Sequence, residues 1–146
     1  MAMTRTLSLG ALLLMMAGIL GLFFSKALFS PSPVVIATQC AAVALMAWAR
    51  LTLGRRSFHA AADPTAGGLV TGGPYRFIRH PIYTAACLFG WAGMLGNWSW
   101  RAGLFGALLF LGALGRMLCE ERLVTEQYPE YRQYAKSTKR MVPGVF

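Results

Sequence analysis

Three stretches of the chain carry no charged residue and are long enough to cross a lipid bilayer as helices. They cover residues 7–25, 27–49 and 81–100, and a shorter uncharged stretch, 102–115, continues beyond a single arginine. A hydrocarbon core of about 30 Å requires about 20 apolar residues in a helix. The composition agrees, because 56% of the residues are hydrophobic and only 13% are charged, far from the balance of soluble proteins. The sequence therefore predicts four transmembrane helices, near residues 7–24, 33–51, 81–97 and 101–119.

The length of 146 residues leaves room for one domain, which we expect to be an all-α integral membrane fold. Its expected parts are an N-terminal helical hairpin (1–53), a cytosolic loop (54–80), a second helical hairpin (81–119) and an interfacial tail (120–146). The loop is longer than most structureless connections, which favours a functional role. In the tail, Tyr128, Tyr131 and Tyr134 recur at every third residue, which predicts one face of an interfacial helix.

The net charge of +9 is distributed very unevenly along the predicted spans. Only Lys26 and Arg101 lie in the connections on one side, and all other Lys and Arg residues fall on the opposite side. This asymmetry places both termini in the cytoplasm, and we expect a multi-pass protein of a bacterial or archaeal inner membrane. The basic face favours anionic lipid headgroups over nucleic acid as its partner.

Basic and aromatic residues gather just before the third predicted span. These residues are Tyr75, Arg76, Arg79, His80 and Tyr83. Pro81 suits the first position of a helix, so His80 lies near the N-cap, where free backbone amides attract anionic groups. A histidine that merely caps the helix is the simpler alternative, but the neighbouring donors favour a functional site.

Carboxylates follow the fourth predicted span. Arg116 and Glu120 are four residues apart on one helical face, although an arginine that precedes a glutamate is the less favourable order for a pair. An ionisable residue inside a span is costly and tends to face the protein interior, so a structural ion pair and a functional role both stay open for Arg116. Glu120 and Glu121 should reach the same membrane surface as His80, where a carboxylate can hold an ammonium group.

The remaining reactive residues give no further pattern. Cys40, Cys87 and Cys119 lie far apart without metal-ligand spacing, so neither a disulfide framework nor a metal site is expected. His59 is isolated in the loop and is expected at the surface.

Two ordered sequence blocks resemble the isoprenylcysteine carboxyl methyltransferase and phospholipid methyltransferase superfamily. The first block is LVTGGPYRFIRHPIY at residues 69–83. The second block begins with Arg116-x3-Glu120-Glu121-Arg122-Leu123, continues through the three spaced tyrosines and ends in Lys139-Arg140-Met141-Val142-Pro143. Two features differ from the family pattern: many members have five or more spans, and Thr84-Ala85-Ala86 lacks a glycine that is common at this place.

The resemblance implies a membrane enzyme that transfers the methyl group of S-adenosylmethionine to a lipophilic acceptor and releases S-adenosylhomocysteine. It implies a cytosol-facing cofactor pocket between the hairpin 81–119 and the tail. The implied cofactor-binding residues are Gly72, Gly73, Tyr75, His80, Tyr83, Glu120 and Glu121. The implied catalytic residues are Arg116, which would orient a carboxylate of the acceptor, and Glu120.

Methyl transfer from a sulfonium mainly requires alignment and the exclusion of water. A carboxylate acceptor needs no base, whereas an amine or thiol must lose a proton, which His80 or a glutamate could take. The acceptor stays open among a lipidic carboxylate, a phospholipid amine and a small thiol. Membrane lipids are expected partners, and a homo-oligomer is a further possibility. A noncatalytic lipid-binding protein is the alternative from another class, but it would not need His80, Glu120 and Glu121.

Overall fold

A computed structural model of the chain describes residues 2–54 and 68–146. The described residues form α1 (Ala2–Phe24), α2 (Pro33–Leu53), the 3-10 helix η2 (Gly73–Arg76), α3 (Pro81–Gly96), α4 (Trp100–Gln127) and α5 (Tyr131–Ser137). Within these ranges there is no strand, and an isolated bridge joins Ile78 to Lys139. The expectation of an all-α fold is confirmed.

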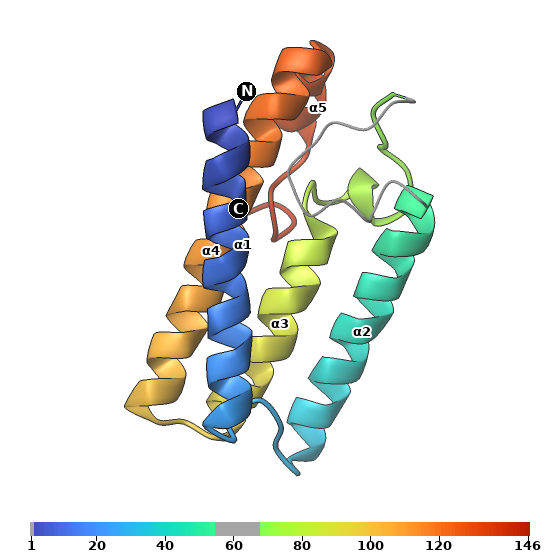
Figure 1. Cartoon of the computed structure of the whole chain (residues 1–146). Helices are drawn as coiled ribbons and strands as arrows, with labels where there is room; N and C mark the ends of the chain where they lie inside the picture. The colour runs from blue at the N-terminus through green and yellow to red at the C-terminus, as the bar shows by residue number, and fades with distance from the viewer. Residues whose placement is uncertain (1, 55–67) are drawn as a thin grey trace.

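The four long helices run side by side along the molecule (Figure 1). The start of α1, the end of α2, the start of α3 and the end of α4 all lie at one end, together with α5. Lys26 follows α1 and Arg101 lies in the first turn of α4, so both belong to the opposite end. The folded chain therefore has one strongly basic end, as the charge pattern predicts.

Among the described residues, three helices are long and apolar enough to span a membrane: α1, α2 and α4. The shorter helix α3 has 16 residues. At 1.5 Å per residue it rises about 24 Å, which is less than the hydrocarbon core of about 30 Å. The expected four spans thus have three clear counterparts, and the crossing of the membrane by α3 stays a proposal.

The pairing of the helices differs from the expected N-terminal hairpin. α1 packs most extensively against α4, and α2 packs against α3, whereas α1 and α2 make little contact with each other. Two glycines allow α1 and α4 to approach closely: a Cβ on Gly18 would lie 2.5 Å from the backbone N of Leu109, and one on Gly112 would lie 2.4 Å from the backbone N of Met15. Small residues thus set the main interface, as is common between membrane helices.

The tail is broken into two helical pieces. α4 ends where the Tyr128 N–H donates to the Val124 carbonyl at 2.7 Å, and Pro129 has no N–H with which to continue the helix. Tyr128 therefore does not share a helix with Tyr131 and Tyr134, and the prediction of a single helical face for all three tyrosines is wrong. Tyr131 and Tyr134 do lie together in α5, with ring centroids 5.7 Å apart.

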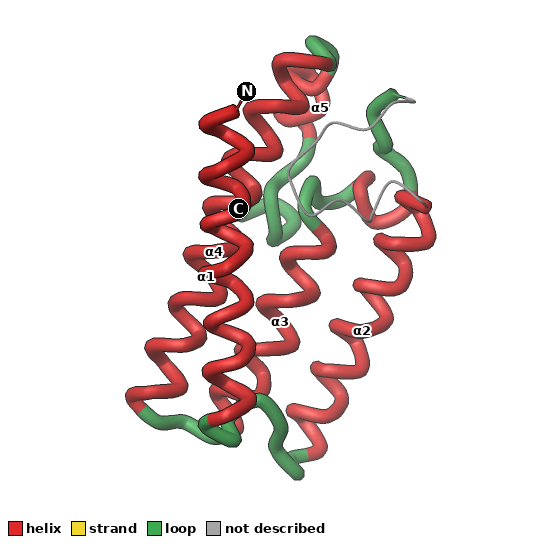
Figure 2. Tube along the Cα trace, in the orientation of Figure 1, coloured by secondary structure: helices red, strands yellow, loops and turns green. Residues whose placement is uncertain are grey.

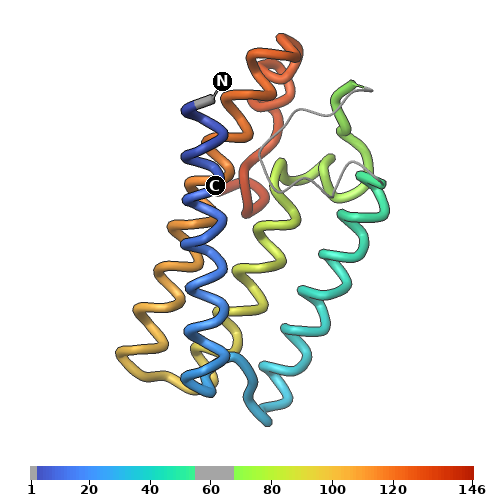
Figure 3. The backbone as a smooth tube through the Cα atoms, in the orientation of Figure 1, coloured from blue at the N-terminus to red at the C-terminus, as the bar shows by residue number. Residues whose placement is uncertain are grey.

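Beyond α5 the chain turns back to the start of α3, as the traces in Figures 2 and 3 show. The Arg79 N–H donates to the Lys139 carbonyl at 2.7 Å, and the His80 N–H donates to the Arg140 carbonyl at 2.9 Å. The Thr84 hydroxyl donates to the Met141 carbonyl at 3.1 Å. The tail is thus fastened to the first turn of α3, next to the charged end of α4.

Candidate active site

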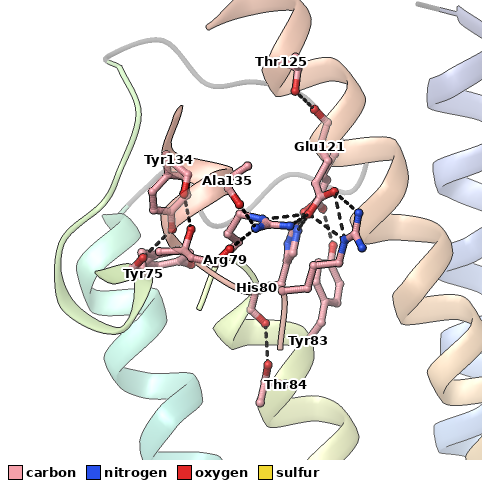
Figure 4. Close-up of polar contacts among 12 residues, drawn as sticks. Tyr75, Arg79, His80, Tyr83, Thr84, Glu121, Thr125, Tyr134 and Ala135 are labelled. Carbon is pink, nitrogen blue, oxygen red and sulfur yellow. Dashed lines mark hydrogen bonds and ion pairs between the residues drawn. The ribbon is translucent and has the colours of Figure 1, made fainter. Parts of the chain in front are cut away.

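Three segments bring polar side chains together at the basic end of the molecule. They are the first turn of α3 with the residues before it, the last third of α4, and the tail after α5. Figure 4 shows Arg79 and His80 directed at the Glu121 carboxylate, with Tyr83 beside them. Of the residues that the sequence singled out, the structure places His80, Tyr83, Arg116, Glu120 and Glu121 in this cluster.

Glu121 is surrounded by three cationic or potentially cationic groups. Arg79 donates to Oε1 through Nε at 3.1 Å and Nη2 at 3.0 Å. Arg140 approaches from the tail, with Nη2 at 2.9 Å from Oε2 and Nε at 3.1 Å from each oxygen. The Nε2 atom of His80 lies 3.2 Å from Oε1. Both oxygens of Glu121 are therefore occupied by groups of the protein.

This environment keeps Glu121 ionised. Glu121 lies beyond the apolar part of α4, and its side chain is 14% exposed. Burial alone raises the pKa of this carboxyl, but hydrogen bonds from His80 and Arg140 and the charge of Arg79 together hold the pKa well below its usual range.

Glu120 belongs to a second set of contacts, with Tyr83 and Arg116. The Tyr83 hydroxyl donates to Glu120 Oε1 and accepts a hydrogen bond from Arg116 Nε at 2.7 Å. Arg116 Nη2 lies 3.3 Å from the same Glu120 oxygen. The Arg116 side chain is 6% exposed, whereas that of Glu120 is 27% exposed. The arginine is thus held inside the protein, and the carboxylate lies where a ligand can reach it.

His80 connects the two glutamates. It occupies the N-cap position of α3, directly before Pro81, as the sequence predicts, and its side chain makes no capping hydrogen bond. Its side chain is 8% exposed, with Nδ1 at 3.8 Å from Glu120 Oε2 and Nε2 at 3.2 Å from Glu121 Oε1. The two ring nitrogens therefore face two different carboxylates.

The sequence assigns no role to Arg140 and counts Arg79 only among the donors that gather before the third predicted span. Arg79 Nη1 donates to the carbonyls of Ala135, at 2.9 Å, and Thr138, so the guanidinium joins α4 to the tail. Both arginines lie inside the two sequence blocks of the resemblance, next to His80 and Met141. The sequence shows where both arginines lie in the chain. That they share Glu121 as a partner becomes clear only from the folded tail.

η2 places Tyr75 and the glycine pair beside this cluster rather than within it. Tyr75 is 8% exposed, and its carbonyl accepts a hydrogen bond from the Tyr134 hydroxyl at 2.5 Å. Burial, followed by the negative charge of Glu120, raises the pKa of the Tyr75 phenol. Gly73 has φ of +55° and faces α2, where an added Cβ would lie 2.5 Å from Thr52 Oγ1. A Cβ on Gly72 would meet nothing within 4 Å.

Two further observations concern the described residues outside this cluster. Residues 2–54 and 68–146 contain no group of three or more His, Cys, Asp or Glu side chains that could hold a metal ion. An apolar groove of about 240 Å³ lies between α3 and α4 near the opposite end from the charged cluster, lined by Trp91, Met94, Trp98, Gly103, Gly106, Ala107 and Phe110. None of these side chains is titratable. His59 lies outside the described residues.

Comparison with known proteins gives one finding. A family model described as phospholipid methyltransferase matches residues 52–131. Neither the curated proteins nor the solved structures provide a match. The matched range includes His80, Tyr83, Arg116, Glu120 and Glu121, whereas Arg140 lies beyond it. Together with the three span-capable helices, this match indicates a membrane methyltransferase. Because the match covers more than half of the sequence, the chain belongs to the phospholipid methyltransferase family.

Proposed function

We propose that this protein transfers the methyl group of S-adenosylmethionine to a lipophilic or membrane-associated acceptor at the cytoplasmic surface of the membrane. The observation that carries the proposal is the pairing of a partly exposed carboxylate, Glu120, with a buried histidine, His80, at the basic end of the fold. The family match agrees with the reaction type.

The chemistry of the polar cluster suits the binding of S-adenosylmethionine. S-adenosylmethionine carries an α-ammonium group and supplies a methyl group on a positively charged sulfur. An ionised carboxylate accepts hydrogen bonds from an ammonium group, and Glu120 is the carboxylate of this cluster that the protein leaves partly exposed. Glu120 and His80 would hold the ammonium group, and Tyr75 and Tyr83 would form apolar walls.

The residues around Glu120 serve to fix its position. The Tyr83 hydroxyl and Arg116 Nη2 both contact Glu120 Oε1, which leaves Oε2 on the side of His80. A preorganised carboxylate loses little freedom when a ligand binds. The expected role of Arg116 in orienting a carboxylate of the acceptor stays a proposal, since in this structure its guanidinium contacts Tyr83 and Glu120.

The first experiment is calorimetric binding of S-adenosylmethionine and S-adenosylhomocysteine to the full chain in lipid nanodiscs. Saturable binding is expected for the wild type, and Glu120→Gln should weaken it about tenfold because an ammonium group loses its charged acceptor. A His80→Ala, Glu120→Gln double variant should lose binding altogether. Glu126→Gln is the matched control, because Glu126 lies in the same helix and pairs with Arg122 at the exposed surface.

Absence of binding by well-folded wild-type protein would contradict the proposal and favour a noncatalytic lipid-binding protein. Unchanged affinity in the double variant would contradict the assignment of His80 and Glu120 to the cofactor site. If binding occurs, transfer of a radiolabelled methyl group to lipid carboxylates, phospholipid amines and small thiols would identify the acceptor class.

A further inference from the structure

The sequence treats Glu120 and Glu121 as an equivalent pair, but the structure gives them different surroundings. Glu121 has six contacts within hydrogen-bond distance, all from Arg79, His80 and Arg140. An ionised carboxylate offers about four lone-pair sites. Donors of the protein therefore occupy the lone-pair sites of the Glu121 carboxylate, which leaves no vacant site for an ammonium group of a ligand.

The contact with Glu121 determines which nitrogen of His80 carries the proton. An ionised carboxylate can only accept hydrogen bonds. Nε2 of His80 lies 3.2 Å from Oε1 of Glu121, so Nε2 must be the donor in this pair. In a neutral imidazole the other nitrogen is then an acceptor, because one ring nitrogen donates and the other accepts.

That second nitrogen faces the exposed glutamate. His80 Nδ1 lies 3.8 Å from Glu120 Oε2, which is too long for a direct hydrogen bond. In that neutral state His80 Nδ1 and Glu120 Oε2 are both hydrogen-bond acceptors and repel each other weakly. A donor group placed between them could contact both atoms. An ammonium group has several N–H donors and can satisfy the two acceptors together.

We propose that Glu121 is a positioning residue that accepts the His80 Nε2–H and thereby leaves the His80 Nδ1 lone pair free next to Glu120 Oε2. These two acceptor atoms together form the binding site, here called the ammonium seat, for the ammonium group of the methyl donor. This inference rests on the proposed function, and it adds that Glu121 acts through His80 without touching the ligand. Arg79 and Arg140 hold Glu121 in place and join it to the tail.

The chain allows a direct test, because it contains only two histidines, His59 and His80. In a His59→Gln background with ¹⁵N-labelled histidine, the nitrogen chemical shifts of His80 report its tautomer. The expected result without ligand is the neutral Nε2–H form. Addition of S-adenosylhomocysteine should shift the Nδ1 resonance, since this atom gains a hydrogen bond.

Two substitutions of Glu121 separate positioning from general stability. Glu121→Leu removes the acceptor and should mix the His80 tautomers and weaken S-adenosylhomocysteine binding about tenfold or more. Glu121→Gln keeps an acceptor oxygen and should preserve the tautomer and most of the affinity. Glu126→Gln is the control and should change neither the tautomer nor the affinity, because Glu126 lies in the same helix and pairs with Arg122 at the exposed surface.

An Nδ1–H tautomer or an imidazolium in the ligand-free wild type would overturn the proposal. This measurement uses the wild type alone, so it tests the proposal even if Glu121→Leu fails to fold. Unchanged tautomer and affinity in folded Glu121→Leu would overturn it as well. The Nε2–H form in a wild type that binds no S-adenosylhomocysteine would overturn the proposed function and the ammonium seat, but support the positioning of His80 by Glu121.

Discussion

Tyr83 joins the buried arginine to the exposed glutamate through a single hydroxyl group. That hydroxyl accepts from Arg116 Nε at 2.7 Å and donates to Glu120 Oε1. Tyr83→Phe keeps the ring and removes both hydrogen bonds, so Glu120 should lose part of its fixed orientation. We expect the affinity for S-adenosylhomocysteine to fall by about threefold to tenfold, which calorimetry would measure.

A second tyrosine provides the matched control for this substitution. Tyr128 follows α4, eight residues beyond Glu120 in the chain, and its hydroxyl accepts from the neighbouring Gln127 side chain at 3.3 Å. Tyr128→Phe should leave the affinity unchanged. Equal affinities for wild type and Tyr83→Phe would show that Glu120 does not depend on this hydroxyl.

The sequence predicted which residues meet and raised the contact between Arg116 and Glu120, but it did not predict the other partners. His80, Tyr83, Arg116, Glu120 and Glu121 lie in motif blocks at the ends of predicted spans, and helix geometry alone brings them to one membrane surface. The distinct surroundings of the two glutamates depend on the path of the tail after α5, which carries Arg140 to Glu121. A chain reversal of this kind leaves no periodic pattern in the sequence.

The interface between α1 and α4 is the most extensive helix contact, and it depends on a glycine in the middle of α4. A Cβ on Gly112 would lie 2.4 Å from the Met15 nitrogen and 2.7 Å from the Ala11 oxygen, both backbone atoms of α1. Backbone of a helix cannot move aside as a flexible side chain can. Gly112→Ala should therefore lower the free energy of unfolding by about 1–3 kcal/mol, measured by denaturation in mixed micelles.

Gly10→Ala is the control, because a Cβ on Gly10 would meet nothing within 4 Å. In a helix interior this change removes the conformational freedom of glycine and should leave the protein as stable or slightly more stable. If both alanine variants were equally stable, α1 and α4 would not pack as closely as the structure shows.

Uncharged runs revealed where the helices lie, because a membrane allows few charges within a span. They did not reveal which helices pack together. The sequence suggested that the first two helices form a hairpin, since they are neighbours in the chain, but Gly18 and Gly112 bring α1 to α4 instead. Such pairing follows from matched small residues on two distant helices, which a single sequence does not disclose.

The orientation of the whole chain in the membrane depends on whether the short helix α3 crosses it. α3 and α4 run antiparallel, with the Trp91 indole N–H donating to the Gly106 carbonyl at 3.0 Å. If α3 crosses, Lys26 and Arg101 share the external side, and the cluster around Glu121 faces the cytoplasm. If α3 does not cross, Arg101 must lie on the cytoplasmic side instead. Local thinning of the bilayer accommodates a helix that is a few ångströms short at modest cost.

Labelling of single cysteines with a membrane-impermeant maleimide distinguishes these topologies. In a background without Cys40, Cys87 and Cys119, we expect Lys26→Cys and Arg101→Cys to react in right-side-out vesicles. Arg132→Cys, which lies in α5, should react only in inverted vesicles. Reaction of Arg101→Cys and Lys26→Cys from opposite sides of the membrane would exclude four spans. The expected pattern would place His80, Glu120 and Glu121 on the cytoplasmic side of the membrane, as the proposed function requires.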